Sequence, residues 1–300
     1  MTDSGFDNIP VVAIAGSNSL FNEQPGLKIN WLKILPTLFS TVIFSDCLAQ
    51  LYTASIVREK KEGAANLLKE KYLKKASEVI IQNRHQKLYA LLREAVQEFN
   101  AATFSNTKLP QVGIVGEIFL KFNSFSHRHI IKHLQKESIE VLPPQISPFF
   151  IQSFVNRKVN KMYGLSESKV PEFIFDGIYA LVERYIAKAN TICSDFEYFS
   201  PICNIFNEAE QAKQIIELGC QFGEGWLIPA EVSAYYERGV YNVMSLQPFG
   251  CIANHIISKG MEKKLKAKFP KLNLLSLDFD GGTSEVNIEN RVELFKSAMV

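Results

Sequence analysis

The sequence predicts an α/β protein in which a mainly helical region precedes a domain built on a four-stranded parallel sheet. In the N-terminal third, apolar residues recur at spacings of three and four, which indicates helices. From Gln111 onward, short apolar runs alternate with helical patterns, as in parallel sheets with covering helices. The polar stretch 105–110 separates the two patterns. We therefore expect a helical region at residues 1–108 and an α/β domain at residues 109–300, with a helical insertion at 145–239.

The helical region begins with one apolar run, residues 10–15, that we expect to form a short strand. Helical patterns follow it. The expected helices span residues 31–44, 46–57, 64–73 and 77–99. We expect the chain to break between them near Pro36, Ser45 and Gly63, since proline, serine and glycine interrupt helical patterns.

Four apolar runs of strand length define the sheet. They lie at residues 111–115, 139–142, 241–246 and 272–277, and the helical patterns that cover them lie at residues 125–137, 254–268 and 284–297. Because crossovers between parallel strands are right-handed, few arrangements remain. We expect the strand order 2-1-3-4 of a flavodoxin-like, doubly wound sheet. In that order the chain reverses direction between its first and third strands.

Two polar turns that contain glycine are expected to meet at this reversal. Gly116 and Glu117 follow the first strand, and residues 247–251 follow the third. Ligands of doubly wound sheets bind beyond the carboxyl ends of the strands at such a point. The sequence therefore predicts a ligand-binding crevice between two segments that are distant along the chain.

Cys251 is the strongest candidate for chemistry in this crevice. It follows a Pro-Phe-Gly turn and precedes a helical pattern, so the helix dipole favours its thiolate, the form that binds metals and attacks electrophiles. His255, one turn further on, could form a nucleophilic pair with it. The alternatives are a small buried residue at a helix start and a histidine that only packs. Cys203, in an expected loop, is a candidate second metal ligand or a buried free cysteine.

A group of polar residues after the first strand has both a functional and a structural interpretation. His127, Arg128 and His129 open a helical pattern that continues to His133. They could bind phosphate at a helix N-terminus, or they could simply be the polar start of a helix. Asp278 is expected to end the fourth strand.

The composition is that of a soluble globular protein, with 300 residues, 47% hydrophobic, 21% charged, and a net charge of +2. Lysines mix with glutamates even in the most basic run, residues 58–75, which is typical of a solvated helix face, so we expect no nucleic-acid partner. The apolar run 35–52 contains Ser45 and Asp46, and we expect a core helix there, with no membrane span and no signal peptide. Five scattered cysteines favour reduced thiols and a cytoplasmic location.

Four motifs together resemble a known family. They are VGIVGEIFLKFNSF at residues 112–125, FGEGW at 222–226, LQPFGCIANHI at 246–256 and LDFDGGTSEVNIENRVELF at 277–295. This combination resembles the carboxyl-terminal region of the acyl-CoA dehydratase activase-related proteins, which are relatives of the 2-hydroxyacyl-CoA dehydratase subunits and of the benzoyl-CoA reductase type. The resemblance covers most of residues 111–300.

The resemblance implies anaerobic chemistry on acyl-CoA thioesters, in which a [4Fe–4S] cluster charged by an ATP-dependent activase supplies an electron for radical dehydration or reduction. It implies that Cys251 is a cluster ligand, and Cys203 is the candidate for a second. The expected catalytic residues are Glu117 and His255. The expected cofactor-binding residues are Gly116, Gln247, Gly250 and Asn254.

The chain also departs from this family. It lacks an actin-like ATP-binding half and a cysteine-bearing upstream segment, His127 and Arg128 replace an expected asparagine pair, and residues 58–61 read Arg-Glu-Lys-Lys in place of Arg-Pro-Tyr-Glu. The other cluster ligands would have to come from a cysteine-bearing partner subunit. Two alternatives stay open: a non-catalytic interaction module that has kept the fold, and a thiol enzyme that uses Cys251 with His255.

Overall fold

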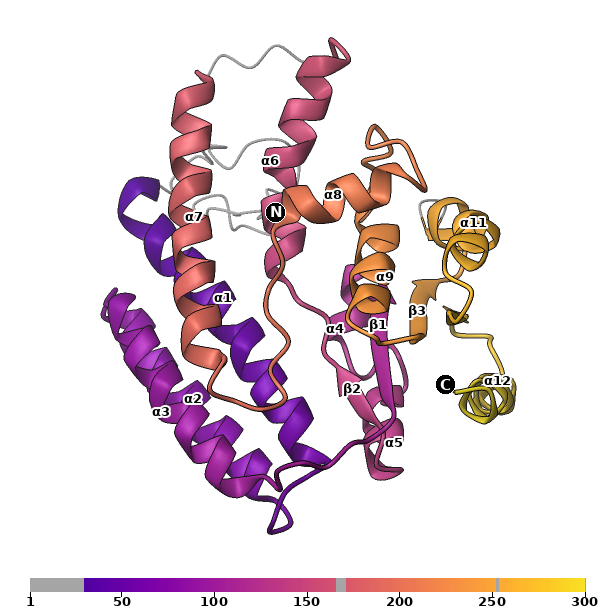
Figure 1. The fold of residues 1–300 in the computed structure, drawn as a ribbon, viewed down its shortest axis with the longest axis horizontal. Coiled ribbons are helices and arrows are strands. Elements are labelled where there is room, and N and C mark those ends of the chain that lie inside the picture. Colours follow the sequence, from indigo (N-terminus) through magenta and orange to yellow (C-terminus); the bar gives the residue numbers. More distant parts are fainter. Residues whose placement is uncertain (1–29, 166–170, 252–253, 300) are drawn as a thin grey trace, which may run out of the picture.

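The structure, a computed structural model, describes residues 30–165, 171–251 and 254–299, and the strand expected at residues 10–15 lies outside them. Its centre is a sheet of four parallel strands in the order β2-β1-β3-β4 (Figure 1). The strands are β1 (Gln111–Gly116), β2 (Glu140–Leu142), β3 (Asn242–Pro248) and β4 (Asn273–Phe279). The predicted fold class, strand direction and strand order are confirmed.

Helices cover this sheet and form a further layer beside it (Figure 1). Three precede the sheet: α1 (Trp31–Ile56), α2 (Ala64–Ile81) and α3 (Gln86–Ala102). Between β1 and β3 lie α4 (Ile118–Phe122), α5 (Ile130–Lys136), α6 (Ser147–Met162), α7 (Glu172–Cys193), α8 (Ile205–Lys213) and α9 (Leu227–Glu237). A π-helical turn, η2 (His255–Lys259), and α11 (Gly260–Lys268) follow β3, and α12 (Glu285–Ser297) follows β4.

Both faces of the sheet are buried, because successive side chains of a strand point to opposite faces. On β3, Met244 and Leu246 share a core with residues of α5 and α12. Val243, which directly precedes Met244 and faces the other side of the sheet, shares a second core with residues of α9 and α11. The helices thus hold the strand ends in fixed positions, which is what a site at the sheet edge requires.

A third core joins the helices of the adjoining layer. It contains Leu48 of α1, Leu92 of α3, Ile186 of α7 and Trp226, which lies immediately before α9. In Figure 1 these helices lie together on one side of the sheet. The boundary expected near residue 108 coincides with the start of β1, but the helices that precede the sheet share a core with those of the insertion. The two helical segments therefore form one layer.

Helix α1 is longer than predicted, because the two helices expected on either side of Ser45 form a single helix that also contains Pro36. The Ser45 side chain is exposed, so it does not compete for the backbone hydrogen bonds of the helix. Asp46 is buried and accepts hydrogen bonds from the backbone N–H groups of Ile146 (2.8 Å) and Ser147 (2.9 Å). Its carboxylate therefore stabilises the start of α6.

The break between α2 and α3 also differs from the prediction, which placed it near residues 74–76. The structure places it after Ile81, where Asn83 has a φ of 52°. Asparagine is one of the few residues other than glycine that adopts this left-handed conformation readily. Asn83 therefore marks the break in the sequence, although the apolar periodicity continues across it.

Arg58 is an exception to the solvated basic face predicted for residues 58–75. Its side chain is 2% exposed and forms a 2.8 Å salt bridge with Glu140 of β2, which is 4% exposed. The guanidinium group also donates to two backbone carbonyl oxygens. Such a buried pair is tolerated when its remaining polar groups are satisfied, and here it joins the end of α1 to the edge strand. Lys71 and Lys75, further along, are exposed as predicted.

Among the described helices, one segment, Lys33–Ile56 of α1, is long and apolar enough to cross a membrane. Half of it (50%) is buried inside the protein. It packs against α2, α3 and α7, as the core helix of a soluble protein does.

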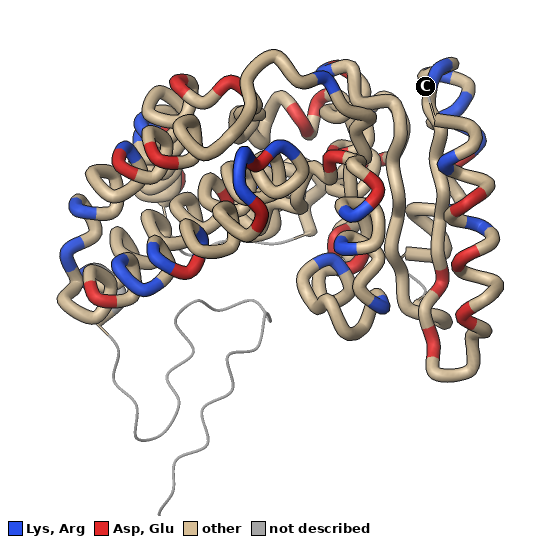
Figure 2. Tube along the Cα trace, turned by 90° about the horizontal axis from the view of Figure 1, so that it is seen from below, with Lys and Arg blue, Asp and Glu red and all other residues tan. Residues whose placement is uncertain are grey.

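Basic and acidic residues are interspersed along the other helices (Figure 2).

We predict that Gly116→Ala destabilises the protein by about 2–4 kcal/mol. Gly116 has a φ of 115°, and a β-carbon there would collide with the carbonyl oxygen of Leu246 in β3. The free energy of unfolding, measured in urea, tests this. The matched control is Gly177→Ala at an exposed position in α7 with no neighbouring atom in the way, which should stabilise by about 0.5–1 kcal/mol. Equal effects of the two variants would contradict the prediction.

Candidate functional site

The two turns predicted to meet do so at the carboxyl ends of β1 and β3. Gly116 pairs with Leu246 in the parallel register of these strands. The backbone N–H of Glu117 continues this pairing by donating to the carbonyl oxygen of Leu246 over 2.8 Å. The segments after β1 and β3 therefore leave the sheet side by side, at the point where the chain reverses.

The two carboxylates on the β1 side accept hydrogen bonds from backbone N–H groups. Glu117 is the N-cap of α4, and its side chain accepts a hydrogen bond from the N–H of Leu120 over 2.9 Å. Glu224, in the loop before α9, is 4% exposed and accepts from the N–H of Ile118 over 2.7 Å. Both acids thus satisfy N–H groups at the start of α4 that have no partner inside the helix.

Cys251 lies on the β3 side, partly exposed, directly after the strand. The side-chain amide of Asn254 donates to its sulfur over 3.2 Å. The N–H of His255 donates to the carbonyl oxygen of Cys251 over 2.9 Å, which is the first helical hydrogen bond of the segment. Gly250, with a φ of 77°, provides the left-handed turn that precedes the cysteine.

The His255 imidazole forms no hydrogen bond with the Cys251 sulfur. Its Nε2 accepts a hydrogen bond from the N–H of Gly250 over 3.2 Å and lies 3.8 Å from a carboxylate oxygen of Asp278 on β4. The nucleophilic pair expected of Cys251 and His255 is therefore replaced by two separate arrangements, thiol with amide and imidazole with carboxylate.

Asp278 is the site residue that the sequence did not reveal. It accepts hydrogen bonds from Gln247 over 2.6 Å and from Lys259 over 2.5 Å. Partial burial acts to raise the pKa of Asp278, but these two hydrogen bonds and the charges of Lys259 and His255 outweigh it and hold the pKa below its usual value. The signal that could have identified it is the strand register, which places Asp278 opposite Gln247.

Two amide oxygens near the end of β3 are buried without a hydrogen-bond partner. They belong to Gln247 (Oε1) and Asn254 (Oδ1), whose side chains are both 0% exposed. Leaving such an acceptor unpaired costs about 1–3 kcal/mol. Both atoms are enclosed by protein where β3 ends and the following segment begins.

Cys203 lies far from Cys251. Its sulfur accepts a hydrogen bond of 2.5 Å from Arg238, at the end of α9 that precedes β3. Cys251 follows the other end of this seven-residue strand, which is about 23 Å long. Burial raises the pKa of the Cys203 thiol, with the charge of Arg238 acting in the opposite direction. The two cysteines expected to share a metal are not brought together.

The histidine group after β1 is also not arranged as a phosphate site. His127 is 2% exposed, and burial lowers its pKa. The Arg128 guanidinium donates to the carbonyl oxygen of Thr283 over 2.8 Å, which joins this segment to the turn before α12. Helix α5 begins only at Ile130 and has seven residues, so these side chains form the connection before a short helix.

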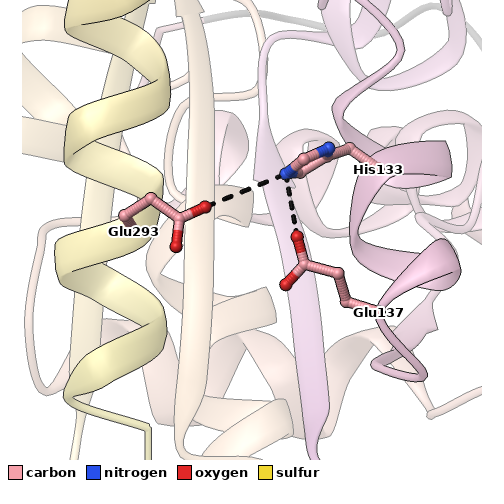
Figure 3. Close-up of side chains that lie close together, drawn as sticks. All are labelled: His133, Glu137 and Glu293. Carbon is pink, nitrogen blue, oxygen red and sulfur yellow. Dashed lines mark ion pairs between the residues drawn. The ribbon is translucent and has the colours of Figure 1, made fainter.

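His133, Glu137 and Glu293 are the one group of three possible metal ligands in the described part of the chain (Figure 3). The imidazole Nε2 lies 3.0 Å from Glu137 and 4.0 Å from Glu293. Lys296 already pairs with both carboxylates, at 2.5 and 2.6 Å. This group is an exposed ion-pair network between α5 and α12, and the ammonium group supplies its counter-charge.

An iron–sulfur cluster is held by several cysteine thiolates. In the ranges that the structure describes, no group of three metal-ligating side chains contains a cysteine. Cys47 and Cys193 are fully buried in the core of the helical layer. These residues do not hold a whole cluster, and Cys251 could provide a single ligand.

We predict that Cys251 reacts with iodoacetamide at least about tenfold faster than Cys47 and Cys193 in the folded protein, because it is the accessible thiol of the three. Peptide mapping by mass spectrometry after timed alkylation measures the rates. In urea the three rates should converge. A native Cys251 that reacts as slowly as Cys47 would show that the thiol is not accessible at the sheet edge.

Comparison of the chain with models of known families, with curated proteins and with solved structures finds no match.

Proposed function

We propose that this chain is a subunit of a 2-hydroxyacyl-CoA dehydratase-like system, to which it contributes Cys251 as one ligand of an iron–sulfur cluster completed by cysteines of another chain. The observation that carries the proposal is the position of Cys251. Its thiol is partly exposed where doubly wound sheets bind their ligands, and the Asn254 amide donates to its sulfur. Hydrogen bonds to sulfur are among the features that set the potential of such clusters.

The surrounding residues support the proposal through their chemistry. Gly116 allows the turns after β1 and β3 to approach each other. Gln247 and Asn254 each hold a buried amide oxygen that has no hydrogen-bond partner. His255 is 29% exposed and lies beside Asp278, so it is the group at this edge best placed to exchange protons with a ligand. Glu117, expected to be catalytic, serves as a helix cap, and the proposal gives it no chemical role.

The substrate class, the partners and the location rest on the resemblance of the motifs. We propose acyl-CoA thioesters as substrates, with an ATP-dependent activase and a cysteine-bearing subunit as partners, in the cytoplasm. One observation supports the need for a second chain: among the described residues, no group of three metal-ligating side chains includes Cys251.

A second candidate function is a non-catalytic interaction module. The observation that favours it is that the polar groups around Cys251 already pair with one another. Asp278 binds Lys259 and Gln247, and His255 binds the backbone of Gly250. A site that is neutralised internally can persist after a cofactor has been lost.

Iron and sulfide analysis with EPR spectroscopy, on tagged protein isolated without oxygen from the cells that produce it, tests the proposal. We expect the isolated complex to contain a [4Fe–4S] cluster whose signal is lost in Cys251→Ala. The control is Cys203→Ala, which removes a cysteine at the other end of β3 and should leave the cluster intact.

The chain produced alone and reconstituted with ferrous iron and sulfide should bind little iron, because it offers one thiolate. Iron that persists in the complex of Cys251→Ala would contradict the ligand assignment. A complex without iron, for the natural sequence, would contradict the proposed system and favour the interaction module.

A further inference from the structure

A cavity of about 30 Å³ lies between the helical layer and α9, away from the site at the sheet edge. A space of this size holds one or two water molecules. Gln50 of α1, Glu208 of α8, and Glu231 and Arg238 on α9 line it, together with Ser200 and the segment after β2. The cavity therefore lies where three helices from distant parts of the sequence meet.

Two of the lining side chains carry buried polar atoms that have no partner. Glu208 is 6% exposed and its Oε2 accepts no hydrogen bond, while Gln50 is 4% exposed and its Nε2 donates none. The Oε1 of Gln50 accepts from the N–H of Ser200 over 3.0 Å, which fixes the orientation of the amide. The cavity thus presents one unpaired acceptor and one unpaired donor.

The charged groups around Glu208 are engaged elsewhere. On α9, Glu231 pairs with Lys121 of α4 at 3.0 Å. Arg238 donates to Ser200 over 2.7 Å and to Cys203 over 2.5 Å.

Tyr235, also on α9, donates to a carbonyl oxygen of β1. The pKa of the Glu208 carboxyl is raised to about 7. Burial is the largest cause and the negative charge of Glu231 is the second, whereas Arg238, Lys121 and the Cys203 thiol lower the pKa.

We propose that this cavity is an internal water site in which Glu208 holds a proton while α8 is packed against α6 and α9, so that opening of this packing releases the proton. Water fits both unpaired atoms, since it can donate to a carboxyl oxygen and accept from an amide N–H. A metal cation would meet the Gln50 N–H and the Arg238 guanidinium, and an anion would meet two carboxyl groups.

The sign of the pH dependence follows from the two states. When α8 opens, the Glu208 carboxyl enters water and its pKa returns to the ordinary value of 4.5 from about 7. The packed state therefore binds more protons between these values, and its stability falls as the pH rises. The equilibrium constant for opening should increase by up to tenfold per pH unit, about 40-fold in all between pH 5 and 7, and level off above pH 7.

Amide hydrogen exchange of α8, expressed as protection factors that correct for intrinsic exchange rates, measures this opening between pH 5 and 8. Asp46, whose pKa burial raises to about 6, also titrates in this range, so the comparison of variants is decisive. We expect Glu208→Gln, which remains neutral, to lose most of the pH dependence. Glu210→Gln, an exposed position on the same helix, should keep it.

The proposal would be overturned if Glu208→Gln and Glu210→Gln showed the same pH dependence as the natural sequence. A second measurement serves if Glu208→Gln folds poorly. Infrared difference spectra of the natural protein between pH 6 and 8 should show the carbonyl band of a buried neutral carboxylic acid, and a spectrum without that band at pH 6 would also contradict the proposal. Neither experiment depends on iron or on acyl-CoA, so the proposed function is tested separately.

Discussion

The contact between β1 and β3 at Gly116 is the constraint on which the site depends. A residue with a side chain would force the two strands apart at this position, because its β-carbon would overlap the backbone of Leu246. Without that side chain the strands stay paired to their ends, and the N–H of Glu117 adds a last hydrogen bond between them. The segments that contain Glu117 and Cys251 therefore leave the sheet from the same edge.

Helix α9 and the residues that flank it connect this edge to the helical layer through three charged side chains. Glu224 binds the start of α4, Glu231 binds Lys121 of α4, and Arg238 binds the segment before α8. This segment thus stabilises the turn after β1 and also lines the cavity that contains Glu208.

The sequence was sufficient for the sheet because crossover handedness leaves few strand orders, and it placed the turns of Gly116 and Cys251 at one edge for the same reason. It could not place Asp278 in the site, because that requires the register between β3 and β4. It also missed the Arg58–Glu140 pair, since local polarity suggested a solvated face. Local patterns predict elements well, whereas contacts between distant charges depend on how the elements pack.

Dipolar EPR broadening between two spin labels tests the meeting of the turns most directly. Labels on Cys251 and on Glu117→Cys, in a protein with Cys203 and Cys220 replaced by serine, should broaden each other strongly, because neighbouring strands lie about 4.8 Å apart. A label on Lys271→Cys, exposed at the amino end of β4, should leave Cys251 unbroadened. Sharp spectra for the first pair, or equal broadening in both, would contradict the arrangement of the sheet edge.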